Sequence, residues 1–225
     1  MRADDLLMGQ LLASVTEGEA SMPRIGVARD GAEPTSAEQR DRHERILDAA
    51  AHLATEFDLP RVQMTEVAKR AGVAIGTLYR YFPSKTHLFV GVMLDRLERF
   101  SGYTPVSDPD VPVQDAICDA LIGMTREMVA YPSLALAMLQ SNSTAVASAV
   151  PDTVKIEATF QEILLTTAGI ADPTEGDKDL LRLMSMLWFG VITAFLNGRS
   201  TTAEAEADIR RSCDLLLVEL SPRSN

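Results

Sequence analysis

The chain has 225 residues, of which 46 % are hydrophobic, so it is long and apolar enough to bury a sizeable core in one domain or two small ones. The net charge of −11 argues against a protein that coats nucleic acid over its whole surface. Two cysteines, Cys118 and Cys213, are too few for a disulfide framework, which favours the reducing cytoplasm. We expect both thiols to be buried as small hydrophobic groups, with a redox role as the less favoured alternative.

Residues 1–36 contain six glycine or proline residues and show no sustained helical period. They predict a flexible N-terminal arm, with a short helix over residues 6–14 as its one ordered segment. Asp4 and Asp5 stand where a signal peptide would need positive charge, and the longest apolar run, at 183–196, is too short to span a membrane. The start of translation, for which Met22 is an alternative, stays open.

A helix is predicted over residues 37–56, with Ser36 as its N-cap. Its apolar stripe consists of Ile46, Ala50, Leu53, Ala54 and Phe57. Three arginines lie on its first turns: Arg40, Arg42 and Arg45. They are either an edge that contacts phosphate or a solvated face paired with nearby carboxylates, and the sequence favours neither.

The segment from Met64 to Leu88 predicts two short helices joined by a tight turn. Gly72 ends the first helix, because glycine tolerates the left-handed conformation found there. Leu78 and Phe82 share the inner face of the second helix, and Pro83 ends it. This is the helix-turn-helix arrangement, whose second helix enters the major groove of DNA.

The expected DNA contacts follow from side-chain chemistry. Arg80 is the one long cationic donor on the second helix, and arginine reads guanine O6 and N7 with two bonds. Ile75 and Ala74 are expected to meet thymine methyls, and Gly76 lets the backbones approach closely. The full predicted set is Arg42, Arg45, Thr65, Ala74, Ile75, Gly76, Thr77, Tyr79, Arg80, Tyr81 and Lys85. For Tyr79 and Tyr81, packing within the domain is the alternative role.

The stretch Ile-Gly-Thr-Leu-Tyr-Arg-Tyr-Phe-Pro-Ser-Lys at 75–85 resembles the recognition-helix signature of the TetR family of repressors, and the resemblance extends over about 40–88. It implies an all-α fold in which a three-helix DNA-binding head (37–90) precedes a ligand-binding and dimerisation body (91–225). It also implies a repressor that ligand binding releases from DNA. Within the family, this stretch is similar to the branch that represses steroid catabolism. Gln63 and Ala74 depart from the family's usual hydroxyl residues, so Thr65 is expected to take over a phosphate contact.

The rest of the chain predicts helices over 84–100, 113–130, 133–140, 151–168, 177–197 and 203–220, with no strand pattern. The helix at 177–197 is apolar on nearly every face, so it must be buried on every face. A monomer's outer layer cannot do this, which predicts a homodimer. The expected interface residues are Leu187, Val191, Phe195, Ile209, Leu216 and Leu220.

The resemblance also implies a ligand pocket in the body. The expected lining, chosen because methionine and aromatic side chains fill adaptable apolar sites, is Met124, Met128, Met138, Phe160, Leu164, Met184 and Trp188. Packing in the core is the alternative for each. We expect a small, largely apolar effector; an acyl or steroid thioester would also need a basic residue, for which Arg126, Lys155 and Arg182 are candidates.

Other classes of function are disfavoured. His43, His52 and His87 all lie in the predicted head and accompany no nucleophile or metal-ligand set, which argues against an enzyme and against any metal or cofactor. An interaction module that has lost DNA binding is suggested only by Gln63 and Ala74.

Overall fold

The computed structural model describes residues 31–103, 110–218 and 220, and within these ranges it contains helices and no strands. The helices are α2 (Ala37–Glu56), α3 (Met64–Ala71), α4 (Ile75–Tyr81), α5 (Lys85–Tyr103), α6 (Val113–Ala130), α7 (Pro132–Thr144), α8 (Asp152–Ala168), α9 (Glu175–Leu196) and α10 (Thr202–Leu216). The all-α class is therefore confirmed. The expected helix at 6–14 lies outside the described residues.

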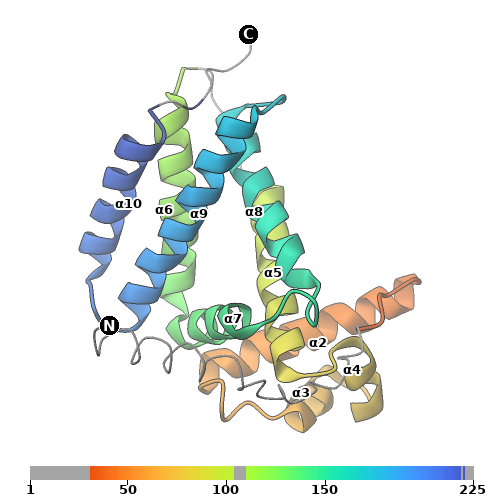
Figure 1. Cartoon of the computed structure of the whole chain (residues 1–225). Coiled ribbons are helices and arrows are strands. Elements are labelled where there is room, and N and C mark those ends of the chain that lie inside the picture. Colours follow the sequence, from red (N-terminus) through yellow and green to blue (C-terminus); the bar gives the residue numbers. More distant parts are fainter. Residues whose placement is uncertain (1–30, 104–109, 219, 221–225) are drawn as a thin grey trace, which may run out of the picture.

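Helices α2, α3 and α4 form the head, at the lower right of Figure 1. The Ser36 side chain accepts a hydrogen bond from the Gln39 backbone and caps α2, as predicted. Gly72 ends α3 with φ 65°, in the left-handed region that favours glycine. Leu78 on the inner face of α4 and Phe82 at its C-cap are both buried. Phe57 is not part of the buried stripe: α2 ends before it, its backbone is extended, and its side chain is 43 % exposed.

Helix α5 connects the head to the body formed by α6–α10. It packs against α2 in the head and against α7 and α8 in the body. Figure 1 shows α5 rising from the head behind α8, with α9, α6 and α10 to the left of these two helices. A shift of α5 therefore acts on both halves of the molecule.

Four helix ends differ from their predicted positions by two or more residues. Helix α5 continues to Tyr103, three residues beyond the expected end. Helix α7 continues to Thr144, four residues beyond the expected end. Helix α9 begins two residues early, because the Thr174 side chain and Asp177 form a capping box. Helix α10 ends at Leu216 rather than at 220, and Leu217 and Leu220 turn inward to buried positions.

Residues 31–34 form a strap over the end of the head. The Ala32 backbone N–H donates to the Arg80 carbonyl at 2.8 Å, and Glu33 pairs with Lys155 on α8 at 3.0 Å. A Cβ at Gly31 would lie 2.0 Å from the Tyr81 carbonyl oxygen, so only glycine fits there. This end of the expected flexible arm is therefore bound both to α4 and to the body.

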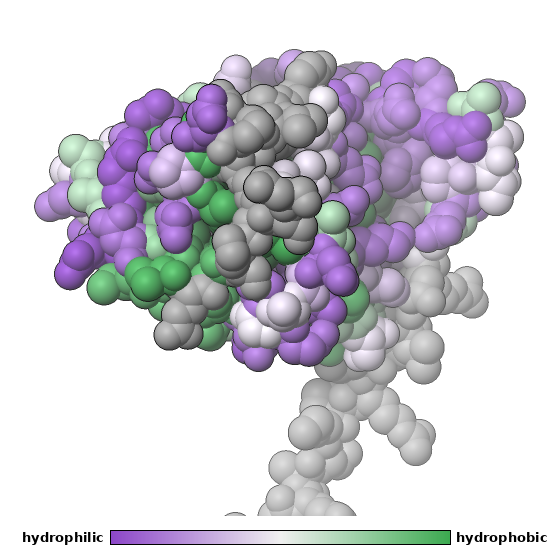
Figure 2. All heavy atoms as spheres, turned by 90° about the horizontal axis from the view of Figure 1, so that it is seen from above, coloured by the Kyte–Doolittle hydropathy of each residue, from purple (hydrophilic) through white to green (hydrophobic). Residues whose placement is uncertain are grey.

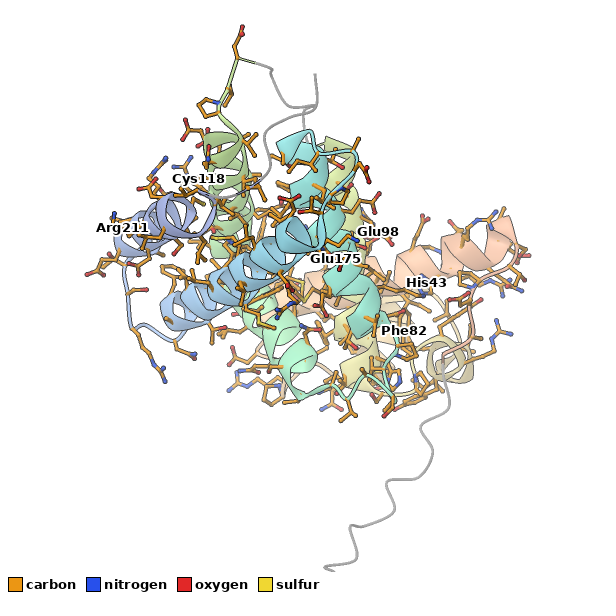
Figure 3. The ribbon with its side chains drawn as sticks, turned by 45° about the horizontal axis from the view of Figure 1, so that its top comes forward. His43, Phe82, Glu98, Cys118, Glu175 and Arg211 are labelled. Carbon is orange, nitrogen blue, oxygen red and sulfur yellow. The ribbon has the colours of Figure 1, made fainter. Side chains whose placement is uncertain are left out.

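The His43 ring lies between α2 and α4, 4.8 Å from the Phe82 ring between centroids (Figure 3). Burial lowers its pKa below the ordinary 6.5, opposed in part by Asp152 and Asp95. Well above pH 6.5 the ring is neutral in both the folded and the unfolded chain. As the pH falls through 6.5 towards the folded-state pKa, the unfolded chain takes up the proton first, so stability is lost.

We therefore expect the melting temperature to fall as the pH is lowered from 7.5 to 5.5, and to fall less in His43→Gln. The control is His52→Gln, since His52 is exposed on the same helix. Thermal unfolding followed by circular dichroism at several pH values measures both. An equal loss in His43→Gln and the wild type would contradict this role for His43.

Candidate DNA interface, effector pocket and dimer face

The outer face of α4 presents the chemistry predicted for reading DNA. Ile75 is 40 % and Tyr79 47 % exposed, unusual values for large apolar or aromatic side chains. A Cβ placed on Gly76 would meet no described atom within 4 Å, so the helix surface there is open to a close-approaching backbone. Ala74 and Arg80 are also exposed and Thr77 is half-buried.

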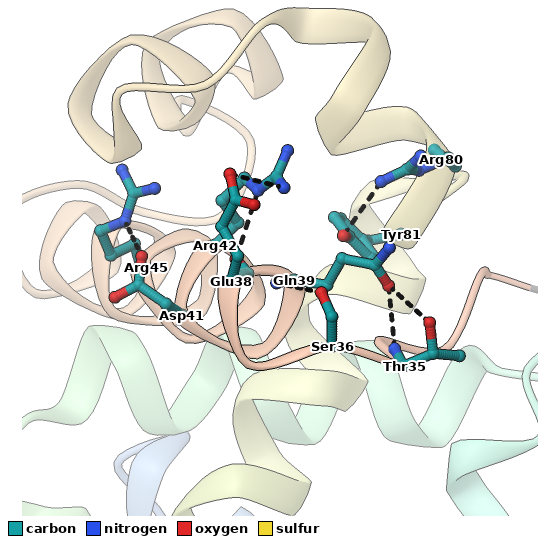
Figure 4. Close-up of polar contacts among 9 residues, drawn as sticks. All are labelled: Thr35, Ser36, Glu38, Gln39, Asp41, Arg42, Arg45, Arg80 and Tyr81. Atoms are coloured by element: carbon teal, nitrogen blue, oxygen red, sulfur yellow. Dashed lines mark hydrogen bonds and ion pairs between the residues drawn. The ribbon is translucent and has the colours of Figure 1, made fainter.

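Tyr81 does not point outward as expected: it is 4 % exposed and packs edge-on against His43. Its hydroxyl instead accepts a hydrogen bond from the Arg80 guanidinium at 3.0 Å (Figure 4), and the guanidinium carbon lies 4.9 Å from the centre of the Tyr81 ring. Position 81 is the last residue of α4, where the inner face of the helix turns onto α2. Tyr81 therefore holds the residue expected to read a base.

Removing the Tyr81 hydroxyl tests this positioning role. We expect Tyr81→Phe to keep the fold, because the ring stays, and to weaken operator binding by roughly three- to tenfold for the loss of one ordinary hydrogen bond. Fluorescence anisotropy with labelled DNA measures the affinity. The same substitution in an Arg80→Ala background should have no further effect; an equal loss in both backgrounds would show that Tyr81 acts otherwise.

Two arginines of α2 engage the protein itself (Figure 4). Arg42 pairs with Glu38 at 3.1 Å, and Arg45 pairs with Asp41 at the same distance. Arg45 also donates to the Ala71 carbonyl at 2.6 Å, where the last carbonyls of α3 lack helical partners. These bonds favour the paired-face alternative over a phosphate-contacting edge, and Arg45 joins α2 to α3.

Lys85 also has partners within the chain. Its ammonium donates to the Leu59 carbonyl at 2.9 Å and to the Pro60 carbonyl at 3.4 Å, and burial lowers its pKa. A phosphate contact would require it to leave these carbonyls. By contrast, Gln63 gives α3 no side-chain cap, so no capping side chain occupies the N-terminal end of α3 next to the exposed Thr65.

A hollow of about 60 Å³ lies in the body between α5, α6, α7 and α9. Four residues of the expected pocket lining border this hollow: Met124, Met128, Met138 and Trp188. The complete lining is Met93, Arg96, Leu97, Phe100, Met124, Glu127, Met128, Tyr131, Leu134, Ala135, Met138 and Trp188. Two larger hollows, of about 300 and 220 Å³, lie between head and body, and most of the residues that line them are polar or charged. The apolar hollow is therefore the candidate effector pocket.

The other three predicted pocket residues belong to the core. Phe160, Leu164 and Met184 have no exposed surface, and the Phe160 ring packs 5.1 Å from Trp188. They lie behind the pocket wall, because α8 and α9 pack directly against each other there. Helical spacing identified apolar positions correctly but did not distinguish the wall from the layer behind it.

Two charged residues of the pocket were missed. Arg96 on α5 and Glu127 on α6 lie 3.9 Å apart across it, with 40 % and 54 % of their side chains exposed. The three basic candidates lie elsewhere, each paired with a carboxylate: Arg126 with Glu206, Lys155 with Glu33 and Asp152, and Arg182 with Asp179. The sequence did contain a signal for Arg96. It lies three residues after Met93, so the two side chains share one face of α5, the face that lines the pocket.

Trp188 links the pocket to α6 through buried polar contacts. Its indole N–H donates to the Thr125 hydroxyl at 2.9 Å and to the Leu121 carbonyl at 3.2 Å. Thr125 is fully buried and donates in turn to Leu121. This is the one tryptophan in the sequence, so its fluorescence reports on the pocket.

The outer side of α9 and α10 is apolar and exposed. Leu183, Met186, Leu215 and Val218 are between 45 % and 68 % exposed. Figure 2 shows hydrophobic side chains gathered at the lower left, on the side of the body where these helices lie. By length and composition α9 would also be able to cross a membrane, but here it packs against α6, α7, α8 and α10.

Among the predicted dimer residues, Leu187, Val191, Phe195 and Leu216 are half-buried and remain available at this surface. Ile209 is fully buried and Leu220 is 7 % exposed, so both face inward and are removed from the set. Ile209 lies on the side of α10 that packs on α6 and α9. We name the exposed set of Leu183, Met186, Leu215 and Val218, with Leu187, Val191, Phe195 and Leu216, the dimer face.

Both cysteines are buried, as expected, on the contacting helices α6 and α10. Burial raises the pKa of Cys118 and Cys213, so both are held as unreactive thiols.

Comparison with known proteins agrees with this architecture. A model of bacterial regulatory proteins of the tetR family matches residues 46–92, and a model of the tetracyclin repressor-like C-terminal domain matches residues 111–216. The HTH-type transcriptional repressor KstR of Rhodococcus jostii is 34 % identical over 191 residues, covering 84 % of this chain and 89 % of the relative. KstR of Mycobacterium tuberculosis is 32 % identical over 183 residues, covering 81 % and 83 %.

Solved structures give the same result. The crystal structure of a TetR transcriptional regulator from Rhodococcus sp. RHA1 is 56 % identical, with a TM-score of 0.75 over 80 % of this chain and 98 % of that one. The regulator FadR of Bacillus subtilis in complex with stearoyl-CoA shares the fold, with 19 % identity and a TM-score of 0.52 over 80 % and 100 %. Together, the matched models and the relatives above 30 % identity show that the chain belongs to the TetR family of bacterial transcriptional regulators.

Proposed function

We propose that the chain is a ligand-responsive repressor that binds a palindromic DNA operator as a homodimer and is released by a small, largely apolar effector. The observation that carries this is the exposed face of α4, where Tyr81 holds Arg80 beside the open backbone at Gly76. In this proposal residues 37–90 bind DNA, residues 91–225 bind the effector and dimerise, and the protein acts in the cytoplasm without catalysing a reaction.

Dimerisation makes the DNA contact strong enough to be specific. One seven-residue recognition helix offers few base contacts, whereas a two-fold dimer presents two helices to half-sites about 34–36 Å apart. The dimer face supplies the apolar surface that such an interface buries. The two copies of α9 and α10 would then form a four-helix contact.

The effector acts through α5. This helix lines the pocket with Met93, Arg96 and Leu97, and three residues after Arg96, Arg99 pairs with Asp48 on α2 at 3.1 Å. Lys85 at its first turn holds the loop between α2 and α3. A ligand that displaces α5 therefore moves the head, and a shift from 1:99 to 99:1 needs about 10⁴-fold preference for the DNA-incompetent form.

A band-shift assay with the palindrome upstream of the chain's own operon tests the proposal. We expect a salt-dependent, specific complex of one dimer per operator that dissociates when the effector is added. Trp188 fluorescence should change over the same effector concentrations, because the indole lines the pocket. Absence of a specific complex with any DNA from that region would refute the proposal.

A second candidate is a repressor of steroid or fatty-acid catabolism released by an acyl-CoA-type ligand. Similarity to the KstR repressors favours the steroid branch, and the fatty acid metabolism regulator of Bacillus subtilis is 32 % identical over 63 residues. Band-shift assays comparing steroid-CoA and fatty acyl-CoA thioesters as releasing ligands distinguish the two. Release by neither would leave the repressor but exclude this class of effector.

A further inference from the structure

The effector pocket combines an apolar wall with a single pair of opposite charges. Ten of its described lining residues are apolar or aromatic, and the other two are Arg96 and Glu127. Their closest atoms are 3.9 Å apart, at the outer limit of an ion pair, and both side chains are about half exposed. A pair this loose adds little stability, so the guanidinium is available to a better anionic partner.

We propose that the effector is an amphiphile with an apolar body and one carboxylate, and that Arg96 binds this carboxylate in place of Glu127. This rests on the proposed function and specifies the ligand class of the same pocket. Arginine suits the task because its planar fork matches a carboxylate with two parallel hydrogen bonds. Glu127 would turn to solvent, where its exposure already places part of it.

The charge around the pocket favours a free acid over a coenzyme A thioester. In a coenzyme A thioester the carboxylate of the acid is replaced by an uncharged thioester group. The coenzyme A part also carries several phosphate charges that need basic partners. Arg126 and Lys155 are paired with carboxylates away from the pocket, and the described lining contains one cation and one anion. A single negative charge can be matched there, whereas a polyphosphate meets Glu127 and a chain of net charge −11.

The size of the pocket requires it to open for such a ligand. Its volume of about 60 Å³ lies well below the roughly 300–1,000 Å³ typical of small-molecule sites. Met93, Met124, Met128 and Met138 supply the adaptable wall, since methionine side chains are unbranched and change shape easily. A ligand that enlarges this hollow would displace α5, which lines it and also packs against α2 in the head.

Titration of Trp188 fluorescence with matched acids and alcohols tests the proposal. The probes are dodecanoic acid with dodecanol, cholanic acid with cholanol, and dodecanoyl-CoA. In the wild type we expect one acid to bind at least tenfold tighter than its alcohol and tighter than the thioester. Arg96→Met should weaken that acid about 10- to 100-fold, as expected for charge-assisted hydrogen bonds, and leave the alcohol unchanged.

Glu127→Gln separates anion recognition from general damage, because it should strengthen acid binding several-fold by removing the competing carboxylate. Arg126→Met removes the same charge from the surface of α6, outside the pocket, and should change nothing. Equal binding of acid and alcohol, tighter binding of the thioester, binding of no probe, or an unaffected Arg96→Met would each overturn the proposal. Operator binding by the wild type is measured alongside. A wild type that binds an acid through Arg96 but binds no operator would mark failure of the proposed repressor function and not of carboxylate recognition.

Discussion

Arg80→Ala combined with Tyr79→Ala is expected to abolish specific operator binding while leaving the protein folded and dimeric. Arg80 is exposed on α4, and Tyr79 is 47 % exposed beside it, so neither contributes to the core. A bidentate arginine–guanine contact is worth about 1–3 kcal/mol, and a dimer makes it twice. The loss of Arg80 alone therefore predicts an affinity decrease of roughly 30- to 20,000-fold.

The matched control for this experiment is Arg126→Ala, which removes the same charge from α6 in the body. Anisotropy titrations with the operator and with a scrambled duplex separate specific from non-specific affinity. The double variant should bind both duplexes alike, with a salt dependence that reflects its remaining phosphate contacts. Undiminished preference for the operator would show that α4 is not the reading element.

The head was largely predictable because its signals are local. Glycine at a helix end, proline after the second helix and apolar residues four apart are decided within one or two turns, and the structure confirms them at Gly72, Leu78 and Phe82. Tyr81 was misplaced because its burial depends on His43, which approaches from α2. The strap at Gly31 and Ala32 was missed for the same reason, since the carbonyls that it meets, those of Tyr81 and Arg80, lie about 50 positions further along the chain.

The body was predictable as a set of helices but not as a site. Helical period identifies which residues face inward, and among those it gave are Met124, Met138 and Trp188, which line the apolar hollow. It cannot say which buried residues border empty space, because that depends on how four helices cross, so Phe160 and Met184 were assigned to the pocket although they are close-packed. Arg96 was overlooked because a charged residue on an apolar face looks like a surface position until the facing helix is known.

The dimer face is a further feature that could be predicted only in part from a single sequence. The all-round apolar character of α9 predicted a partner, and the structure divides that surface into two parts. Leu181, Met184, Trp188 and Ile192 are buried within the chain, while Leu183 and Met186 remain outside. An exposed apolar surface of this kind on a DNA-binding protein is explained most simply by a second copy of the chain.

Met186→Arg is expected to convert the dimer to a folded monomer and thereby to lose operator binding. The Met186 side chain is 59 % exposed in the single chain, so arginine fits there without disturbing the core. In a two-fold interface each substitution enters twice, and an unpaired buried guanidinium costs several kcal/mol. Dimerisation and specific operator affinity should both weaken on the order of 100-fold or more, which light scattering and anisotropy measure.

Val154→Arg is the matched control, because Val154 is also 59 % exposed but lies on α8, away from the dimer face. It should remain a dimer and bind the operator as the wild type does, and both variants should keep the helical content seen by circular dichroism. A dimeric Met186→Arg would place the interface elsewhere on the molecule. A monomeric Met186→Arg with full operator affinity would instead show that a single head suffices, which the short recognition helix makes energetically difficult.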